Sequence, residues 1–526
     1  MTPRRADVLH AAALALGILP LWVGAQLPLV DLPQHLHLIS ALHRLHDGTT
    51  LYPTYFALRN ELTPYLGYYY AVDLLNWVFP LEIANKLFLS AYAVGIPLGL
   101  GFLLRSLGRP RWPSLLALPF AYGDSFSWGF INYCAALPLT FLSCGLFVRA
   151  LTDPRRRRAW ALGHGVVLVL VLLFHVQAFA FLAFALPLLL LMTRAPEDMA
   201  PTSDRSTVSR LWRSRRWALF SVLPAVGLFL LWVIGRMGEP TEVQAGVPWK
   251  AWGPLLSAQN LAFKTFEQNR NELFDVLANT LQDGSDRWAV RVVFAVALFA
   301  VGCWIWARGT AGSREGRLER LRLPALALVA LFLFFTLPFD IRGYMYYLNT
   351  RFAHLAAALG VVSVPPLSRR VRGWLLPAAA ASALVLAVPL ARGFSAFSAE
   401  AAPLLALTQE VPPRVRIMGL IYEPRSSVVT HPVFLHAATV LARASGGITN
   451  FSFASQPHLP LRFRVTPPPT FPSEWRPELN WESMGPAYDA YLLIAPFEPR
   501  AVFGALLDTD LSVAGHEGRF WLIRRR

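Results

Sequence analysis

The sequence predicts a polytopic α-helical membrane protein that ends in a small α/β domain outside the membrane. Of its 526 residues, 55% are hydrophobic and only 15% are charged, and the mean hydropathy is +0.42. Soluble domains are less hydrophobic and more highly charged. The apolar residues also gather in long runs with almost no charge, which is typical of segments that cross a bilayer. Cytosolic enzymes, fibrous proteins and disordered chains are therefore excluded.

Eleven apolar runs are predicted to be membrane spans. They cover residues 8–27, 83–104, 112–122, 128–151, 160–174, 178–192, 217–234, 292–306, 323–337, 352–364 and 374–390. The first run is longer than the core of a signal peptide and many spans follow it, which favours an uncleaved first span. The run at 112–122 is short for a span, and the long run around His175 has to be divided in two.

The basic residues predict how the spans are oriented. The formal net charge is +16, and arginines gather in alternate loops at 105–111, 155–158, 194–216, 314–322 and 369–372. Cytoplasmic loops carry such an excess. We therefore expect an integral inner-membrane protein with a cytoplasmic N-terminus and, since the number of spans is odd, an extracytoplasmic C-terminus. No basic stripe interleaved with aromatic residues occurs in a soluble segment, so nucleic acid is not an expected partner.

This topology divides the chain into two domains. Residues 1–392 form the membrane domain, with a first extracytoplasmic loop at 28–81 and a second large loop at 238–288, and residues 393–526 form the extracytoplasmic α/β domain. In this domain we expect strands at 414–422 and 488–494, helices at 435–444 and 501–507, and a closing hairpin at 513–524. The three cysteines all lie in apolar runs, which excludes a disulfide framework and a clustered zinc site.

The first ionisable residues outside the first span are Asp31 and His35. If Pro33 starts a short helix, the two side chains could face the same side, because they are four residues apart. Such a pair suits a carboxylate base that is oriented by a histidine, or two ligands of a metal ion. A third interpretation is that Asp31 only caps the helix.

Further polar residues lie at the outer ends of later spans. Lys86 could hold a phosphate as a point charge, or could snorkel to the interface. Asp124, between the third and fourth spans, is a candidate second acid, although it need not be catalytic. Arg342, Tyr347 and Arg351 lie in the outer loop before the tenth span. Arginine grips phosphate in a fixed fork, and arginines on the outside run against the positive-inside bias.

The membrane part also has a distinctive order of elements. A first span is followed at once by an acid, then by a Tyr-rich interfacial segment at 65–79, then by a span that ends in Arg105-Ser106-Leu107-Gly108-Arg109, and later by an arginine at the start of an outer helix. This order resembles the GT-C superfamily of integral membrane glycosyltransferases, over residues 1 to about 392. The resemblance implies transfer of a sugar from a polyprenyl-phosphate donor to a glycan, lipid or protein acceptor at the outer membrane face.

The same resemblance suggests a role for each candidate residue. Asp31 takes the place of the catalytic acid of the first loop, and Asp124 matches a second acid. Lys86 and Arg351 take places near the lipid phosphate. Many members carry two acids close together in the first loop, whereas His35 follows Asp31 here. The sequence therefore leaves a requirement for a divalent cation open and predicts no metal-ligand set.

The leading hypothesis is thus a lipid-linked sugar transferase. Asp31 accepts the proton of the acceptor hydroxyl and His35 orients its carboxylate. The groups that bind the donor and stabilise the departing phosphate are predicted to be Lys86, Arg342, Arg351 and Tyr347. The alternative is a membrane transporter or flippase for a lipid or a polar solute, which would place ionisable residues near the bilayer midplane. A third hypothesis is a scaffold whose C-terminal domain binds a partner.

Overall fold

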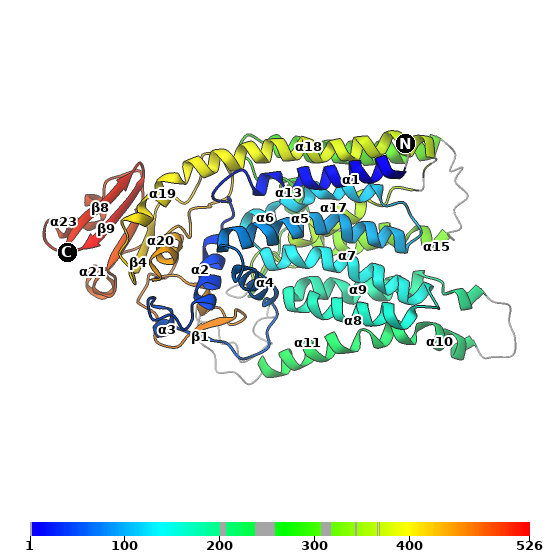
Figure 1. The fold of residues 1–526 in the computed structure, drawn as a ribbon, viewed down its shortest axis with the longest axis horizontal. Coiled ribbons are helices and arrows are strands. Elements are labelled where there is room, and N and C mark those ends of the chain that lie inside the picture. The colour runs from blue at the N-terminus through cyan, green and yellow to red at the C-terminus, as the bar shows by residue number, and fades with distance from the viewer. Residues whose placement is uncertain are drawn as a thin grey trace.

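Long helices run side by side in one bundle, and a small sheet domain lies at one end of it (Figure 1). The computed structural model describes residues 3–199, 207–236, 258–306, 317–341, 345–365, 367 and 369–526. Within these residues, five helices are long and apolar enough to cross a membrane, and a bent pair of helices adds a sixth. The chain is therefore a multi-pass helical membrane protein, as predicted.

Each of the eleven predicted spans overlaps a helical segment, although residues 22–27 of the first run are not helical. The five long helices are α5 (Leu81–Ser106), α7 (Ile131–Thr152), α8 (Arg157–Phe174), α14 (Ser285–Trp306) and α18 (Arg369–Glu400). The pair bent by 46° consists of α10 (Thr207–Phe220) and α11 (Leu223–Arg236). The shorter apolar helices are α1 (Pro3–Gly17), α9 (Val176–Met192), α16 (Arg322–Thr336) and α17 (Arg351–Val361).

The short third run is a 3-10 helix, η2 (Trp112–Tyr122), and all of its residues are buried. It packs against α1, α5 and α18 inside the bundle. A 3-10 helix rises about 2 Å per residue, so this run reaches about 22 Å, whereas an α-helix of the same length would reach about 16 Å. The tighter winding explains how so short a run extends deep into the bundle.

The long run around His175 is divided in two, as predicted. Helix α8 ends at Phe174 and α9 begins at Val176, while His175 itself is extended, with φ −160° and ψ 122°. Its Nδ1 atom accepts a hydrogen bond from the backbone N–H of Gln177 at 3.1 Å. This side-chain cap satisfies one of the free donors at the start of α9.

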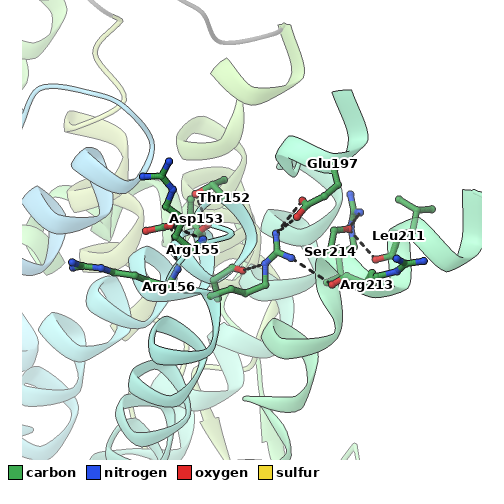
Figure 2. Close-up of polar contacts among 12 residues, drawn as sticks. Thr152, Asp153, Arg155, Arg156, Glu197, Leu211, Arg213 and Ser214 are labelled. Atoms are coloured by element: carbon green, nitrogen blue, oxygen red, sulfur yellow. Dashed lines mark hydrogen bonds and ion pairs between the residues drawn. The ribbon is translucent and has the colours of Figure 1, made fainter. Parts of the chain in front are cut away.

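The arginine-rich segments meet at the end of the bundle far from the sheet domain, where the N-terminus also lies (Figure 1). Both terminal nitrogens of Arg157 are engaged there: Nη2 binds Glu197 at 2.8 Å, and Nη1 donates to the carbonyl of Arg213. Figure 2 labels these two partners, Glu197 and Arg213. Arg109 donates to the carbonyl of Arg320 at 2.9 Å. Basic segments from several loops therefore share one end of the molecule.

The C-terminal domain is built on a five-stranded mixed sheet with the order β5-β4-β7-β9-β8. Its strands are β4 (Arg416–Ile421), β5 (Ile448–Thr449), β7 (Ala490–Ile494), β8 (Leu511–Glu517) and β9 (Phe520–Arg525). Strand β4 is parallel to β5 and β7, and the β8–β9 hairpin adds antiparallel to β7. Helix α18 carries the chain out of the bundle toward this domain without a break at 392–393.

The helices of this domain differ in detail from the prediction. Helix α20 (Ala438–Ser445) begins three residues after the predicted start at 435. The single helix expected at 501–507 is two short helices, α22 (Arg500–Phe503) and α23 (Leu506–Thr509). Gly504 separates them with φ +53°, a left-handed conformation that interrupts a right-handed helix. Helix α21 (Trp481–Met484) was not predicted.

The first long loop, residues 28–81, folds against the C-terminal domain. It contains α2 (Leu32–His43), α3 (Tyr52–Tyr55), β1 (Phe56–Leu58) and α4 (Gly67–Asn76). Strand β1 pairs antiparallel with β6 (Leu461–Phe463) of the C-terminal domain. His37 of α2 also binds the carbonyl of Gly447 at 2.9 Å. These contacts hold the start of α2 at the boundary between the two domains.

The second large loop is described only in part. Helix α13 (Phe266–Leu277) lies in it and begins with a capping box between Thr265 and Gln268. Strand β2 (Leu261–Ala262) pairs with β3 (Asp340–Ile341) from the loop before α17. Residues 238–257 of this loop, and Arg342, lie outside the described residues.

Candidate functional site

Asp31 lies at the N-cap position of α2, but its side chain makes no capping hydrogen bond. Its backbone N–H donates to the carbonyl of Trp128 at 3.0 Å, which fixes the residue against the turn that precedes α7. The Oδ1 atom lies 3.3 Å from Nε2 of His436 in the C-terminal domain. The carboxylate therefore faces the C-terminal domain and does not cap its own helix, α2.

His436 bridges two carboxylates. Its Nδ1 atom lies 2.7 Å from Oε1 of Glu474, and only 5% of its side chain is exposed. Burial by itself lowers the pKa of His436, but the carboxylates of Glu474 and Asp31 outweigh that effect and raise the pKa to about 10. The ring is therefore an imidazolium at neutral pH. The sequence prediction included neither His436 nor Glu474.

His35 is engaged elsewhere. Its Nε2 atom donates to the carbonyl of Gly129 at 3.0 Å, so Nδ1 accepts from the hydroxyl of Tyr69 at 2.6 Å. Burial lowers the pKa of His35 to about 4, which keeps the ring neutral. We predicted that His35 would orient Asp31; both of its ring nitrogens have other partners, and the imidazole that faces the carboxylate is that of His436.

Asp124 begins α6 (Asp124–Trp128), the short helix whose last carbonyl holds Asp31. Its Oδ1 atom lies 2.9 Å from Nε2 of His431. His431 and His436 belong to one segment of the C-terminal domain, so this segment supplies a histidine to each of the two candidate acids. The sequence placed both acids on the same side of the membrane but gave no indication of these partners.

Tyr347 packs beside the same helix. The centre of its ring lies 4.7 Å from that of Trp128, and its φ of 56° is left-handed, which is rare for a tyrosine. Burial and the nearby carboxylates, of which Asp124 contributes most, raise the pKa of Tyr347 to about 12. The phenol therefore keeps its proton close to both candidate acids.

Arg351 is a buried cation that meets no counter-ion among the described residues. Its guanidinium lies 4.2 Å above the ring of Phe130, and its Nη2 atom donates to the carbonyl of Tyr346. Only 7% of the residue is exposed, and no carboxylate pairs with it anywhere in the described chain. Its Nε atom is buried without a hydrogen-bond partner. A buried charge is costly unless it is paired, so this site favours an anion.

Two contacts remain at the Nη1 atom of Arg351: Nε2 of His175 lies 2.9 Å away, and Oε1 of Gln177 accepts a hydrogen bond at 3.4 Å. An arginine N–H can only donate, and a neutral imidazole accepts at one nitrogen only. Because Nδ1 of His175 already accepts from the N–H of Gln177, the two donors compete for a single lone pair. Among the described residues the guanidinium thus has no acceptor at Nε, and at Nη1 it has only the long contact to Oε1 of Gln177. A phosphate oxygen would satisfy both.

Lys86 lies apart from these residues. Its ammonium donates to the carbonyl of Gly24 at 2.6 Å and lies 5.9 Å from the ring centre of Trp22. In the described chain, no contact joins it to Arg351 or to Tyr347. The structure thus brings five of the predicted residues together around the 128–130 turn, namely Asp31, His35, Asp124, Tyr347 and Arg351, whereas Arg342 falls outside the described residues.

The described residues of this site do not form a complete set of metal ligands. Across the described ranges, no group of three or more histidine, cysteine or acidic side chains is placed to hold a metal ion. The two acids are each paired with a histidine instead.

Comparisons with known proteins identify the fold. No protein-family model and no curated protein sequence matches the chain. Among solved structures, apo ArnT from Cupriavidus metallidurans matches with a TM-score of 0.54 at 11% identity, over 98% of this chain and 97% of that one. The same protein bound to undecaprenyl phosphate matches with a TM-score of 0.55 at 12% identity, over 99% and 98%. At this identity the likeness concerns the fold, and it confirms the predicted resemblance to GT-C membrane glycosyltransferases.

Proposed function

We propose that the protein is a membrane glycosyltransferase that moves a sugar from a polyprenyl-phosphate donor to an acceptor hydroxyl. One juxtaposition carries the proposal. Asp31, a carboxylate with one oxygen that has no partner in the described chain, and Arg351, a buried guanidinium that meets no counter-ion there, lie on the two sides of the turn from Trp128 to Phe130. A glycosyl transfer from a lipid phosphate needs these two groups: one takes a proton and the other stabilises a leaving phosphate.

The reaction follows from this arrangement. The acceptor oxygen attacks the anomeric carbon of the donor while its proton passes to Asp31. The bond between that carbon and the phosphate oxygen breaks, and its electron pair leaves with the polyprenyl phosphate. Arg351 stabilises the negative charge that gathers on the leaving phosphate, and Tyr347 donates its phenol proton as a hydrogen bond in the same region. Because the surroundings are partly dry, these interactions are stronger than they would be in water.

The lipid nature of the donor is supported by the fold. ArnT, which shares this fold, binds undecaprenyl phosphate. An apolar polyprenyl tail also explains why the site belongs to a helical bundle in a membrane. Lys86 and Arg342 remain proposed contributors at the lipid phosphate, and Asp124 remains the proposed second acid, positioned by His431.

We further propose eleven spans in an inner membrane, with the N-terminus in the cytoplasm. The arginine-rich segments lie at one end of the bundle and the C-terminal domain lies at the other (Figure 1), which suits the positive-inside rule. In this orientation Asp31, Arg351 and the C-terminal domain face the extracytoplasmic side. The acceptor, a glycan, lipid or protein, would approach from there.

The test is mass spectrometry of polyprenyl-phosphate lipids from cells with the intact protein or with Asp31→Asn. We expect a glycosylated carrier to accumulate in the variant, because the donor is no longer consumed. Asp510→Asn, an exposed acid in the C-terminal domain, is the matched control and should leave the lipid pool unchanged. An unchanged pool in cells where Asp31→Asn is stably inserted would contradict the proposal.

A second measurement separates transfer from transport. The accumulated lipid is extracted and mixed in detergent with membranes that hold the intact protein. Detergent abolishes the two leaflets, so a flippase would leave the lipid chemically unchanged. Consumption of the glycosylated carrier, with release of the free polyprenyl phosphate, is the expected result. A carrier that persists in detergent would favour the transporter hypothesis.

A further inference from the structure

The most unusual polar cluster at the domain boundary is the row of side chains Asp31–His436–Glu474. It crosses from the first loop to the C-terminal domain, with 3.3 Å between the first pair and 2.7 Å between the second. The ring of Phe453 packs edge-on against both imidazoles, at 5.5 Å from His436 and at 5.4 Å from His35. The nearest titratable groups around His436 are therefore the two carboxylates and the neutral His35.

Geometry defines what His436 does to Asp31. An ionised carboxylate can only accept hydrogen bonds, and both ring nitrogens of His436 face carboxylate oxygens. The ring must therefore donate in both directions, which requires the protonated form. One donated proton engages Oδ1 of Asp31 and leaves Oδ2 without a partner in the described chain. With 18% of the Asp31 side chain exposed, Oδ2 is the oxygen that a substrate can reach.

We propose that His436 and Glu474 of the C-terminal domain are positioning residues for Asp31, and that the C-terminal domain is in this sense part of the active site. The inference rests on the glycosyltransferase function proposed above. His436 fixes the rotamer of the Asp31 carboxylate, so that Oδ2 points to the acceptor hydroxyl. Glu474 keeps His436 in the double-donor form, because its negative charge compensates for the burial of the imidazolium.

Other contacts hold the two domains together without this row. Strand β1 pairs with β6, and Arg443 of α20 forms an ion pair with Glu82 of α5 at 2.6 Å. Asp31 itself is anchored through its backbone to Trp128. Replacement of His436 or Glu474 should therefore disturb the orientation and charge of the Asp31 side chain more than the fold.

The experiment compares transfer rates over pH 5.5–9.5 in isolated membranes containing the full-length protein. The probe is the glycosylated carrier lipid that accumulates in Asp31→Asn cells, and its consumption is followed by mass spectrometry. The variants are His436→Gln and Glu474→Gln. Their matched controls are His516→Gln and Glu482→Gln, which change exposed residues of the same domain. Thermal unfolding of each purified protein reports whether it is folded.

The two variants have different expected profiles. In the intact protein the pKa of His436 is raised to about 10. His436 is therefore protonated at neutral pH and loses its proton only as the pH rises through that value. Glu474→Gln removes the larger of the two charges that raise this pKa, so activity should remain at low pH and decline at a lower pH than in the intact protein. His436→Gln should lower the rate about 10- to 100-fold at every pH, with little change in the KM for the donor.

The result that overturns the inference is distinct from the failure of the proposed function. If Asp31→Asn is inactive while folded His436→Gln and Glu474→Gln retain the rates and pH profiles of their controls, the positioning role is wrong and the transferase stands. If no variant accumulates a glycosylated carrier, the transferase itself is wrong. A uniform loss of rate in Glu474→Gln, without a shift of its pH profile, also contradicts the role assigned to Glu474.

Discussion

The Nη1 atom of Arg351 lies 2.9 Å from Nε2 of His175, although His175 already accepts a hydrogen bond at its other nitrogen. The N–H of Arg351 therefore faces a ring nitrogen of His175 that cannot accept a hydrogen bond while the other ring nitrogen does. Unlike the ion-paired Arg519, which contacts Glu400 at 3.1 Å, Arg351 meets no carboxylate in the described ranges. The burial of its charge thus costs stability that an anionic ligand would restore.

This arrangement predicts an unusual response to Arg351→Met. In the absence of lipid, the variant should unfold at the same temperature as the intact protein or at a higher one, because a buried unpaired charge is removed. Its transfer rate should fall roughly 100-fold or more, as when one group that stabilises a developing anion is lost. Undecaprenyl phosphate should raise the unfolding temperature of the intact protein but not that of the variant.

Arg519→Met is the control for this prediction. It removes an arginine that has carboxylate partners, so it should lower the unfolding temperature and retain the stabilisation by undecaprenyl phosphate. If Arg351→Met were as destabilising as Arg519→Met and still responded to the lipid, Arg351 would be a structural residue.

A substitution at Gly129 tests how strongly the transfer rate depends on the position of Asp31. Its φ is +87°, and a Cβ atom added there would lie 2.9 Å from both the Cβ and the backbone nitrogen of Asp31. Gly129→Ala should therefore displace Asp31 and lower the transfer rate. Gly518→Ala is the matched control, because φ is +61° there and the added atom meets open space.

Both glycine variants should lose about 1 kcal/mol of unfolding free energy from the left-handed backbone alone. Any further loss in Gly129→Ala, together with its lower rate, measures the contact with Asp31. Equal stability losses and an unchanged transfer rate would show that the turn can yield without moving the carboxylate.

The contact between Asp124 and His431 can be measured by a double-mutant cycle. The two side chains are 2.9 Å apart and are largely buried, so Asp124→Asn and His431→Gln should couple by roughly 1–3 kcal/mol in unfolding free energy. Asp124→Asn combined with His516→Gln should be additive, because His516 lies on the exposed hairpin. Additivity in both pairs would mean that the histidine does not hold the acid.

For several candidate site residues, the sequence predicts that they lie together, because they occur where apolar runs end. Asp31, Asp124 and Arg351 follow or precede apolar runs whose ends we predicted to share one side of the membrane, and the helices bring these ends to the same turn. The histidines could not be predicted. His431 is 307 residues from Asp124, and no local pattern relates the two. The contact between Asp124 and His431 depends on how the C-terminal domain docks, and local sequence patterns do not predict that docking.

Two features of the fold were missed for a different reason. Residues 112–122 looked short because the length of a span was judged by the α-helical rise, and the 3-10 winding of η2 changes that rise. The β1–β6 pair joins two strands of three residues each, which is too short for an alternating pattern to be visible. Each strand is specified by its partner more than by its own sequence.

The position of His436 has a consequence for how the protein comes into being. Asp31 is synthesised near the start of the chain, whereas the imidazole that pairs with it arrives only with the last fifth. At ordinary rates of translation the interval is roughly 20–80 s. Until the C-terminal domain has docked, the acids Asp31 and Asp124 lack their histidine partners. Under the proposed function, transfer therefore begins only after this domain has docked.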